Sequence, residues 1–242
     1  MVTFSGSDDL TGAVFTGVSL RGARFVESDL SGIVMRGVEL SKVDIDAPWL
    51  PDTGPLLING VDVTGYVEDE LDRRFPGRAL RRASDPEGLR TAWASLQRTW
   101  ADTVARAAAM PPGTVDVSVA GEWSFSQTLR HLVLATDLWL GRAVLARDDP
   151  FHPLGLRHDT TDDQPVPPYA DVMDARADRV AMVGDLLGRV TVDDLAVARE
   201  NPHDPAHPET TLSCLHVVLE EEWEHHRFAV RDLDALEASA TS

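Results

Sequence analysis

Residues 211–236 read TLSCLHVVLEEEWEHHRFAVRDLDAL, and this stretch decides the fold of the C-terminal part of the chain. Its apolar residues recur at steps of three and four, which is the spacing of one face of an α-helix. The same stripe continues through the charged centre of the segment. Its positions are Leu212, Leu215, Leu219, Glu222, His226, Ala229 or Val230, and Leu233. The pattern predicts a long helix whose core-facing stripe carries an acid and an imidazole.

This placement predicts a metal site. Burying a carboxylate is costly unless it is paired or bound to a metal. Glu222 and His226 are four residues apart on one face, so both can bind one ion. A third ligand must come from another helix, and His131 lies near the start of a strongly apolar helical segment. We therefore predict a divalent metal held by His131, Glu222 and His226, with a buried polar network that holds no metal as the alternative.

The remaining histidines are weaker candidates. Four fall in predicted loops and one lies well round the last helix: His152, His158, His203, His207 and His216. His225 neighbours the core stripe and is a substitute ligand. Asp137, one and a half turns past His131, is a candidate to support that histidine from outside the ligand set.

Three further helices are predicted upstream. Ser84-Asp85-Pro86-Glu87 is typical of a helix start, and that helix ends at Met110. Ser124 and Gln127 form a capping-box pattern at the start of a helix that runs to about Arg147. A third helix covers Tyr169–Val190, after a long proline-rich loop over 148–168. A short extended stretch at Thr114–Ala120 and a helical turn at Val192–Ala198 complete the prediction. The fold class is mainly α, an up-down four-helix bundle over residues 84–242.

The N-terminal segment repeats every five residues. Residues 9–45 divide as DL-TGAVF-TGVSL-RGARF-VESDL-SGIVM-RGVEL-SKVDI. A large apolar residue ends each unit, a small or apolar residue stands two positions earlier, and Gly usually precedes that. This resembles the pentapeptide-repeat family, which implies a right-handed quadrilateral β-helix over residues 1–48 with both apolar positions pointing inward. The segment is a structural cap or spacer, or else a binding surface or a DNA mimic.

Residues 49–83 form a predicted connector. LLINGVDV (56–63) predicts a short strand pair around Asn-Gly, and YVEDELDRRF (66–75) predicts a helix ended by Pro76-Gly77. The basic residues gathered here are Arg73, Arg74, Arg78, Arg81 and Arg82. They either pair with an acidic neighbour or bind an anionic ligand.

Composition limits the partners. The formal charge of −18 repels phosphate backbones, so nucleic-acid binding is disfavoured. No apolar run approaches the length of a membrane span and the start of the chain has no signal-peptide pattern, so we expect a cytoplasmic protein without membrane contact. With the single cysteine, Cys214, an internal disulfide is excluded.

The motifs WSFSQTLRHLVLATDLWL (123–140) and VLEEEWEHHRFAVRDL (218–233) resemble the DinB-like four-helix-bundle superfamily. A His, Glu, His ligand set is similar to its mycothiol-dependent maleylpyruvate isomerase branch. The resemblance implies a metal, zinc in the first place with nickel as the alternative, that keeps an open coordination position. It also implies a small-molecule thiol and an electrophilic substrate, and it leaves a homodimer open.

Three functions follow from these patterns. The first is a metal-dependent thiol S-transferase, in which the metal activates a low-molecular-weight thiol. The second is a metal-dependent hydrolase, which activates water at the same site. The third is a non-catalytic binding or regulatory module that uses the acidic pentapeptide-repeat surface.

Overall fold

The computed structural model describes residues 3–157 and 166–240. The chain divides into two compact units, Met1–Asp46 and Ala47–Ser242. The predicted connector therefore belongs to the same unit as the bundle. No helix within the described ranges has the length and apolar character that crossing a membrane requires.

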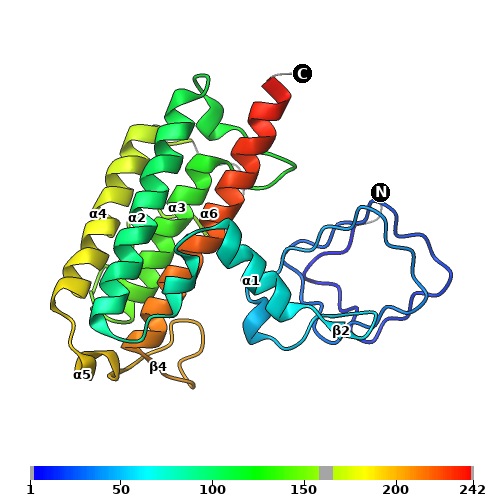
Figure 1. Ribbon diagram of the computed structural model, residues 1–242, viewed down its shortest axis with the longest axis horizontal. Helices are drawn as coiled ribbons and strands as arrows, with labels where there is room; N and C mark the ends of the chain where they lie inside the picture. The colour runs from blue at the N-terminus through cyan, green and yellow to red at the C-terminus, as the bar shows by residue number, and fades with distance from the viewer. Residues whose placement is uncertain (1–2, 158–165, 241–242) are drawn as a thin grey trace. The chain divides into compact units, whose positions relative to one another are not determined.

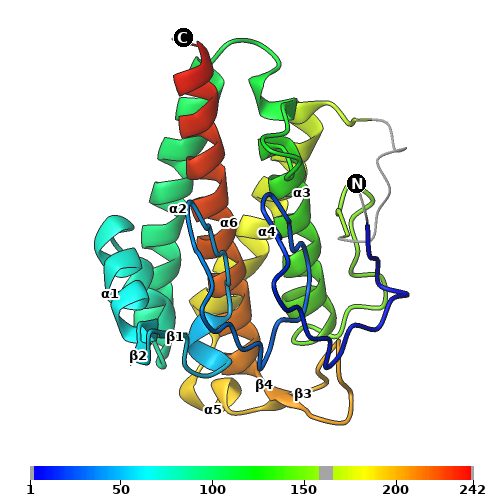
Figure 2. The same cartoon turned by 90° about the vertical axis from the view of Figure 1, so that its right-hand side faces the viewer.

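The second unit is built on four long helices that lie side by side (Figures 1 and 2). They are α2 (Pro86–Ala109), α3 (Phe125–Thr136), α4 (Tyr169–Arg189) and α6 (Thr211–Ala240). Each packs on two neighbours, so that α2, α4, α3 and α6 follow one another around the bundle. Their apolar stripes meet in one continuous core, which is why the spacing in the sequence predicted them. The prediction of a mainly helical fold is confirmed.

The connectivity differs from a simple up-and-down order. The aromatic rings of Phe125 and Tyr169, at the starts of α3 and α4, have centroids 6.5 Å apart, so these two helices run parallel. By contrast, Arg90 near the start of α2 bonds to the Leu187 carbonyl near the end of α4, so that pair is antiparallel. Because α3 and α4 are parallel, the chain has to return to the level of the start of α3 before α4 begins. The long second connection provides this return.

Two helix starts follow from side-chain caps. The Asp85 carboxylate accepts hydrogen bonds from the backbone N–H groups of Glu87 and Gly88 at the start of α2. Ser124 and Gln127 form the predicted capping box at the start of α3. Because α3 continues directly into a π-helix, η4 (Asp137–Arg142), the helical path extends well past Thr136.

The connector forms small elements against the bundle. They are η1 (Leu50–Asp52), β1 (Leu57–Ile58), β2 (Val61–Asp62), α1 (Thr64–Arg74) and η2 (Arg78–Arg82). The strands pair antiparallel around Asn59 and Gly60, whose φ angles of 51° and 82° suit the expected two-residue turn. After α1 the chain turns at Gly77, where φ is 97°.

The loops differ from the prediction at two places, the stretch at Thr114–Ala120 and the end of the helical turn predicted at Val192–Ala198, which stops at Leu195. The extended stretch expected at Thr114–Ala120 begins as a 3₁₀ turn, η3 (Thr114–Asp116). Beyond α5 (Val192–Leu195), the strands β3 (Ala198–Arg199) and β4 (Glu209–Thr210) pair antiparallel just before α6. The pairs are two residues long, too short for alternation in the sequence to reveal them.

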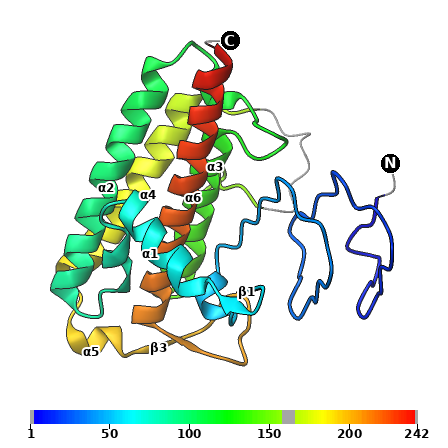
Figure 3. The ribbon, with the colours of Figure 1, turned by 45° about the vertical axis from the view of Figure 1, so that its right-hand side comes forward.

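The first unit follows the five-residue period, and its chain winds in coils (Figure 3). Every fifth residue has a left-handed backbone: Gly12, Gly17, Gly22, Glu27, Gly32, Gly37 and Lys42. Hydrogen bonds close turns at Ala13, Ala23 and Ile33, each of which donates to the residue three before it. The large apolar residues, which the family pattern places inside, are 42% to 60% exposed from Leu10 to Ile45. Over residues 3–46, the structure therefore does not confirm the inward packing that the family pattern implies.

Candidate metal centre

The middle of α6 carries three successive pairs of polar residues spaced four apart. They are Glu220 with Glu224, Glu221 with His225, and Glu222 with His226. A step of one residue turns a helix by about 100°, so the three pairs face different neighbours. Each pair has its own partners in the structure, and only one of them meets His131.

Glu221 and His225 form a three-residue cluster with His131 of α3. One donor atom from each residue lies within 4.8 Å of the others. The Glu221 Oε2 atom is 3.5 Å from Nε2 of His131 and 3.3 Å from Nδ1 of His225. Both imidazoles are buried, whereas the Glu221 side chain is 18% exposed. Two helices thus bring one carboxylate and two imidazoles together at the edge of the core.

The hydrogen bond of His131 decides which nitrogen faces Glu221. Its Nδ1 atom lies 3.1 Å from the carbonyl oxygen of Leu156. A carbonyl oxygen can only accept, so Nδ1 carries the hydrogen, and in the neutral ring Nε2 has a lone pair. That lone pair faces the Glu221 carboxylate. A metal ion placed between these two acceptors would be attracted to both.

Aromatic rings shelter the cluster. The His131 and His225 rings are stacked with centroids 4.7 Å apart. Trp123, which directly precedes α3, lies 4.8 Å from the His131 ring, and Phe228 lies 5.6 Å from the His225 ring. This apolar shell lowers the local polarity around the three donors, which strengthens their interaction with a cation.

The predicted ligands Glu222 and His226 do not meet His131, and this revises the expected ligand set. Glu222, 1% exposed, accepts hydrogen bonds from the Arg176 guanidinium of α4. Burial raises the pKa of the Glu222 carboxyl, and the charge of Arg176 opposes that shift. The buried acid that seemed to require a metal is thus compensated by an arginine on another helix.

His226 faces α2 instead of α3. Its Nε2 atom is 2.8 Å from the Thr103 hydroxyl oxygen, and that hydroxyl donates to the Thr99 carbonyl. His226 Nε2 therefore carries the hydrogen of this bond. Burial lowers the pKa of His226 to about 4, so the ring is neutral at physiological pH.

The third pair docks the connector. Glu220 accepts from Arg81, and Glu224 accepts from Arg78 and from Arg227. The basic cluster of the connector also pairs with Glu68, Glu70 and Asp72 of α1. Of the two interpretations left open by the sequence, pairing with acidic neighbours is the one that the structure supports.

The other sequence candidates lie apart from the cluster. Asp137 is fully buried and bonds to Arg179 and to the backbone of His152. His216 bonds to the Ala83 carbonyl, His207 to Asp204, and the His203 ring packs on Trp139. His158 lies outside the described residues.

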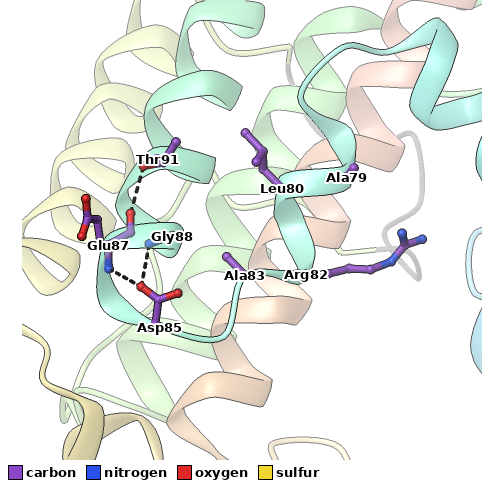
Figure 4. A pocket seen from close by; sticks show the side chains of 8 residues that line it. All are labelled: Ala79, Leu80, Arg82, Ala83, Asp85, Glu87, Gly88 and Thr91. Carbon is purple, nitrogen blue, oxygen red and sulfur yellow. Dashed lines mark hydrogen bonds between the residues drawn. The ribbon is translucent and has the colours of Figure 1, made fainter.

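A surface hollow lies between η2 and the start of α2 (Figure 4), and none of the three clustered residues lines it. The Asp85 carboxylate at its edge is already bonded to the cap of α2. The hollow therefore offers no second site of comparable chemistry.

The sequence pattern named His225 only as a substitute and missed Glu221. The stripe of spacing three and four marks the centre of the buried face, and Glu222 is indeed deeply buried. A site that admits a ligand from outside has to lie at the border of that face, one residue round the helix. The arginines that pair with Glu222 and Glu220, Arg176 and Arg81, were the available signal that these two acids are compensated within the protein.

A helical bundle with a carboxylate and two imidazoles between two of its helices defines a class of candidate metal proteins. A sequence model of the DinB superfamily matches residues 95–229, so the chain belongs to this superfamily. Eight pentapeptide repeats match residues 9–46. The resemblance drawn from the sequence motifs is thereby confirmed. Among curated proteins and among solved structures, no significant match was found.

Proposed function

We propose that this protein is a metal-dependent thiol S-transferase of the DinB superfamily in which His131, Glu221 and His225 hold a divalent cation. Zinc is the first choice and nickel the alternative, because both accept imidazole and carboxylate ligands. The observation that carries the proposal is the His131 Nε2 atom facing the Glu221 carboxylate at 3.5 Å with its Nδ1 hydrogen already committed to Leu156.

The donor set fits such an ion. Donors around a tetrahedral zinc ion lie about 3.5 Å apart, and the three donors here already lie within 4.8 Å of one another. The Leu156 carbonyl fixes the His131 ring in the form that can ligate. A bound ion would give a coordinated thiol or water the character of a thiolate or hydroxide at neutral pH.

The chain itself cannot supply the thiol. Cys214 is the single cysteine, it is 1% exposed, and burial raises its pKa to about 11. A thiol that stays protonated and buried is a poor nucleophile. A transferase built on this site therefore requires a low-molecular-weight thiol from solution and an electrophilic small molecule as its second substrate.

Metal content of purified variants tests the ligand set. We expect the wild type to retain about one equivalent of zinc after dialysis, and Glu221→Gln or His225→Gln to lose it. The matched controls Glu222→Gln and His226→Gln change the next residue of the same helix and should keep the metal. Retention by the first pair with loss by the second would favour the ligand set read from the sequence stripe.

A screen with the zinc-loaded protein separates the reactions. Thiol consumption in the presence of an electrophile, lost in Glu221→Gln, supports the transferase. Ester or amide hydrolysis that does not depend on added thiol supports a hydrolase at the same site. If the protein binds zinc but shows neither thiol consumption nor hydrolysis, the result favours a non-catalytic binding or regulatory role that uses the pentapeptide-repeat unit.

For the first unit we propose a short right-handed quadrilateral β-helix that serves as a structural cap or spacer. What supports this is the left-handed backbone at every fifth residue, which turns the chain at a constant interval. Deletion of residues 1–46 should leave zinc binding unchanged, because the three ligands belong to the second unit.

A further inference from the structure

The chain between η4 and α4 returns along α3 as an irregular segment, residues 150–156. Its backbone is bonded to α3 at several points. The Leu156 amide donates to the Arg130 carbonyl, the Leu156 carbonyl accepts from His131, and the Leu154 carbonyl accepts from the Arg130 guanidinium. The His131 ring therefore lies against this segment and is hydrogen-bonded to its backbone.

One carboxylate fixes the far end of this segment. Asp137, the first residue of the π-helix, accepts the His152 backbone N–H at 2.8 Å through Oδ2 and the Arg179 guanidinium at 2.6 Å through Oδ1. Both side chains of this ion pair are buried. Arg179 also reaches the Pro150 carbonyl at 3.5 Å. Asp137 thus joins α3, α4 and the returning segment.

Close packing leaves the segment no room to shift inward. A Cβ atom added at Gly155 would lie 3.3 Å from Cβ of Leu134 and 3.2 Å from the His152 carbonyl oxygen. A Cβ atom added at Gly141 would lie 3.2 Å from Cβ of Pro150. Glycine at these two positions lets the segment and the helix approach each other, so that the Leu156 carbonyl reaches the imidazole.

We propose that Asp137 is a positioning residue for the metal centre, which it serves by anchoring the 150–156 segment that presents the Leu156 carbonyl to His131. This inference rests on the proposed metal-binding function. A neutral imidazole has two tautomers, and only the one with hydrogen on Nδ1 offers Nε2 to an ion near Glu221. The carbonyl selects that tautomer before any ion binds. Loss of such outer contacts typically weakens metal binding by 10- to 100-fold.

The test uses Asp137→Asn, with Glu222→Gln as matched control. Each substitution neutralises the acid of a buried ion pair that joins α4 to another helix, but among the described residues only the Asp137–Arg179 pair is hydrogen-bonded to the backbone of the segment. The first readout is the ¹⁵N spectrum of the His131 imidazole in metal-free protein. We expect the Nδ1–H form in the wild type and in Glu222→Gln, and a mixture of tautomers in Asp137→Asn.

The second readout is zinc affinity, where we expect a loss of about 10- to 100-fold in Asp137→Asn and little change in Glu222→Gln. A wild-type tautomer and affinity in Asp137→Asn would overturn the inference. If the wild type binds no zinc, the proposed function fails, but the tautomer spectrum still decides the role of Asp137.

If Asp137→Asn does not fold, a second variant with its own control tests the same inference through a smaller structural change. Gly155→Ala should push the segment away from α3 and disturb the His131 tautomer in the same direction. Gly188→Ala, where an added Cβ meets no atom within 4 Å, is its control. An unchanged His131 spectrum in Gly155→Ala would contradict the role assigned to the segment.

Discussion

At the scale of single residues, His225 and His226 are adjacent in the sequence but have very different surroundings. Both are buried, and both stand in the same turn of α6. His226 is surrounded by the rings of Phe75, Trp100 and Trp223, and among the described residues its hydrogen-bond partner is Thr103. His225 instead lies beside a carboxylate and a second imidazole. One residue along the helix separates a packed, neutral imidazole from a candidate ligand.

The pKa of His226 predicts a pH dependence of stability. The folded pKa of about 4 lies below the ordinary value of 6.5, so between these values only the unfolded chain binds the proton. This contribution to stability is complete above pH 6.5 and is lost as the pH falls toward 4, by on the order of 3 kcal/mol.

Denaturant unfolding of wild type and His226→Gln between pH 4 and 7 checks this prediction. The wild type should lose stability on acidification more steeply than the variant, whose glutamine can still donate to Thr103. Parallel pH profiles of the two proteins would show that His226 titrates normally when folded.

At the scale of elements, α6 is the helix that organises the second unit. Its three successive pairs meet the connector, α3, and the α2–α4 side of the core in turn. The helix can therefore hold the candidate ligands rigidly, because the faces on either side of them are fixed by ion pairs and packing.

The docking of the connector on α6 gives a stability prediction. Arg81 is 4% exposed and bonds to Glu68, Asp72 and Glu220, so Arg81→Met removes one of the two buried guanidinium groups of this network and leaves Arg78 as the other. We expect a loss of about 3 kcal/mol in the free energy of unfolding.

Arg82→Met is the control, because Arg82 pairs with Glu68 and Asp72 but is 53% exposed. Its loss should stay below about 1 kcal/mol. Equal losses in the two variants, measured by urea unfolding, would count against a buried anchor at Arg81.

The repeat unit gives a prediction about its turns. Gly17 has φ of 65°, and an added Cβ would meet no atom within 4 Å, so the cost of Gly17→Ala arises in the backbone alone. We expect a loss of about 1 kcal/mol. Hydrogen exchange at the Ala13 and Ala23 amides should then become roughly fivefold faster.

Gly6→Ala is the matched control, since Gly6 lacks the left-handed backbone and also has open space around it. Exchange rates that change equally in both variants would contradict the role given to the left-handed position.

At the scale of the whole molecule, local signals in the sequence predicted most of the architecture. Helix periodicity and caps at Asp85 and Ser124 gave the helix starts, and the period of five gave the repeat unit. What the sequence could not supply was the direction of the long connection, since nothing local shows that α3 and α4 are parallel. The repeat pattern implied that the large apolar residues point inward, but these residues are exposed in the structure.

On α6, the ligand pair expected from the sequence, Glu222 and His226, differs by one residue at each position from the pair that clusters with His131 in the structure, Glu221 and His225. His131 was identified because it is a lone imidazole in an apolar helix. The choice between Glu221 and Glu222 depends on Arg176, which comes from a helix about 50 residues earlier and neutralises Glu222. Such a long-range pair has no signature in a single sequence.

The proposed chemistry depends on a cation bound between His131, Glu221 and His225. A crystal structure of the zinc-loaded protein, with an anomalous difference map at the zinc edge, locates that cation. We expect one strong peak within about 2.2 Å of a donor atom of each of these three residues. A peak between Glu222 and His226, or zinc bound anywhere but this cluster, would contradict it.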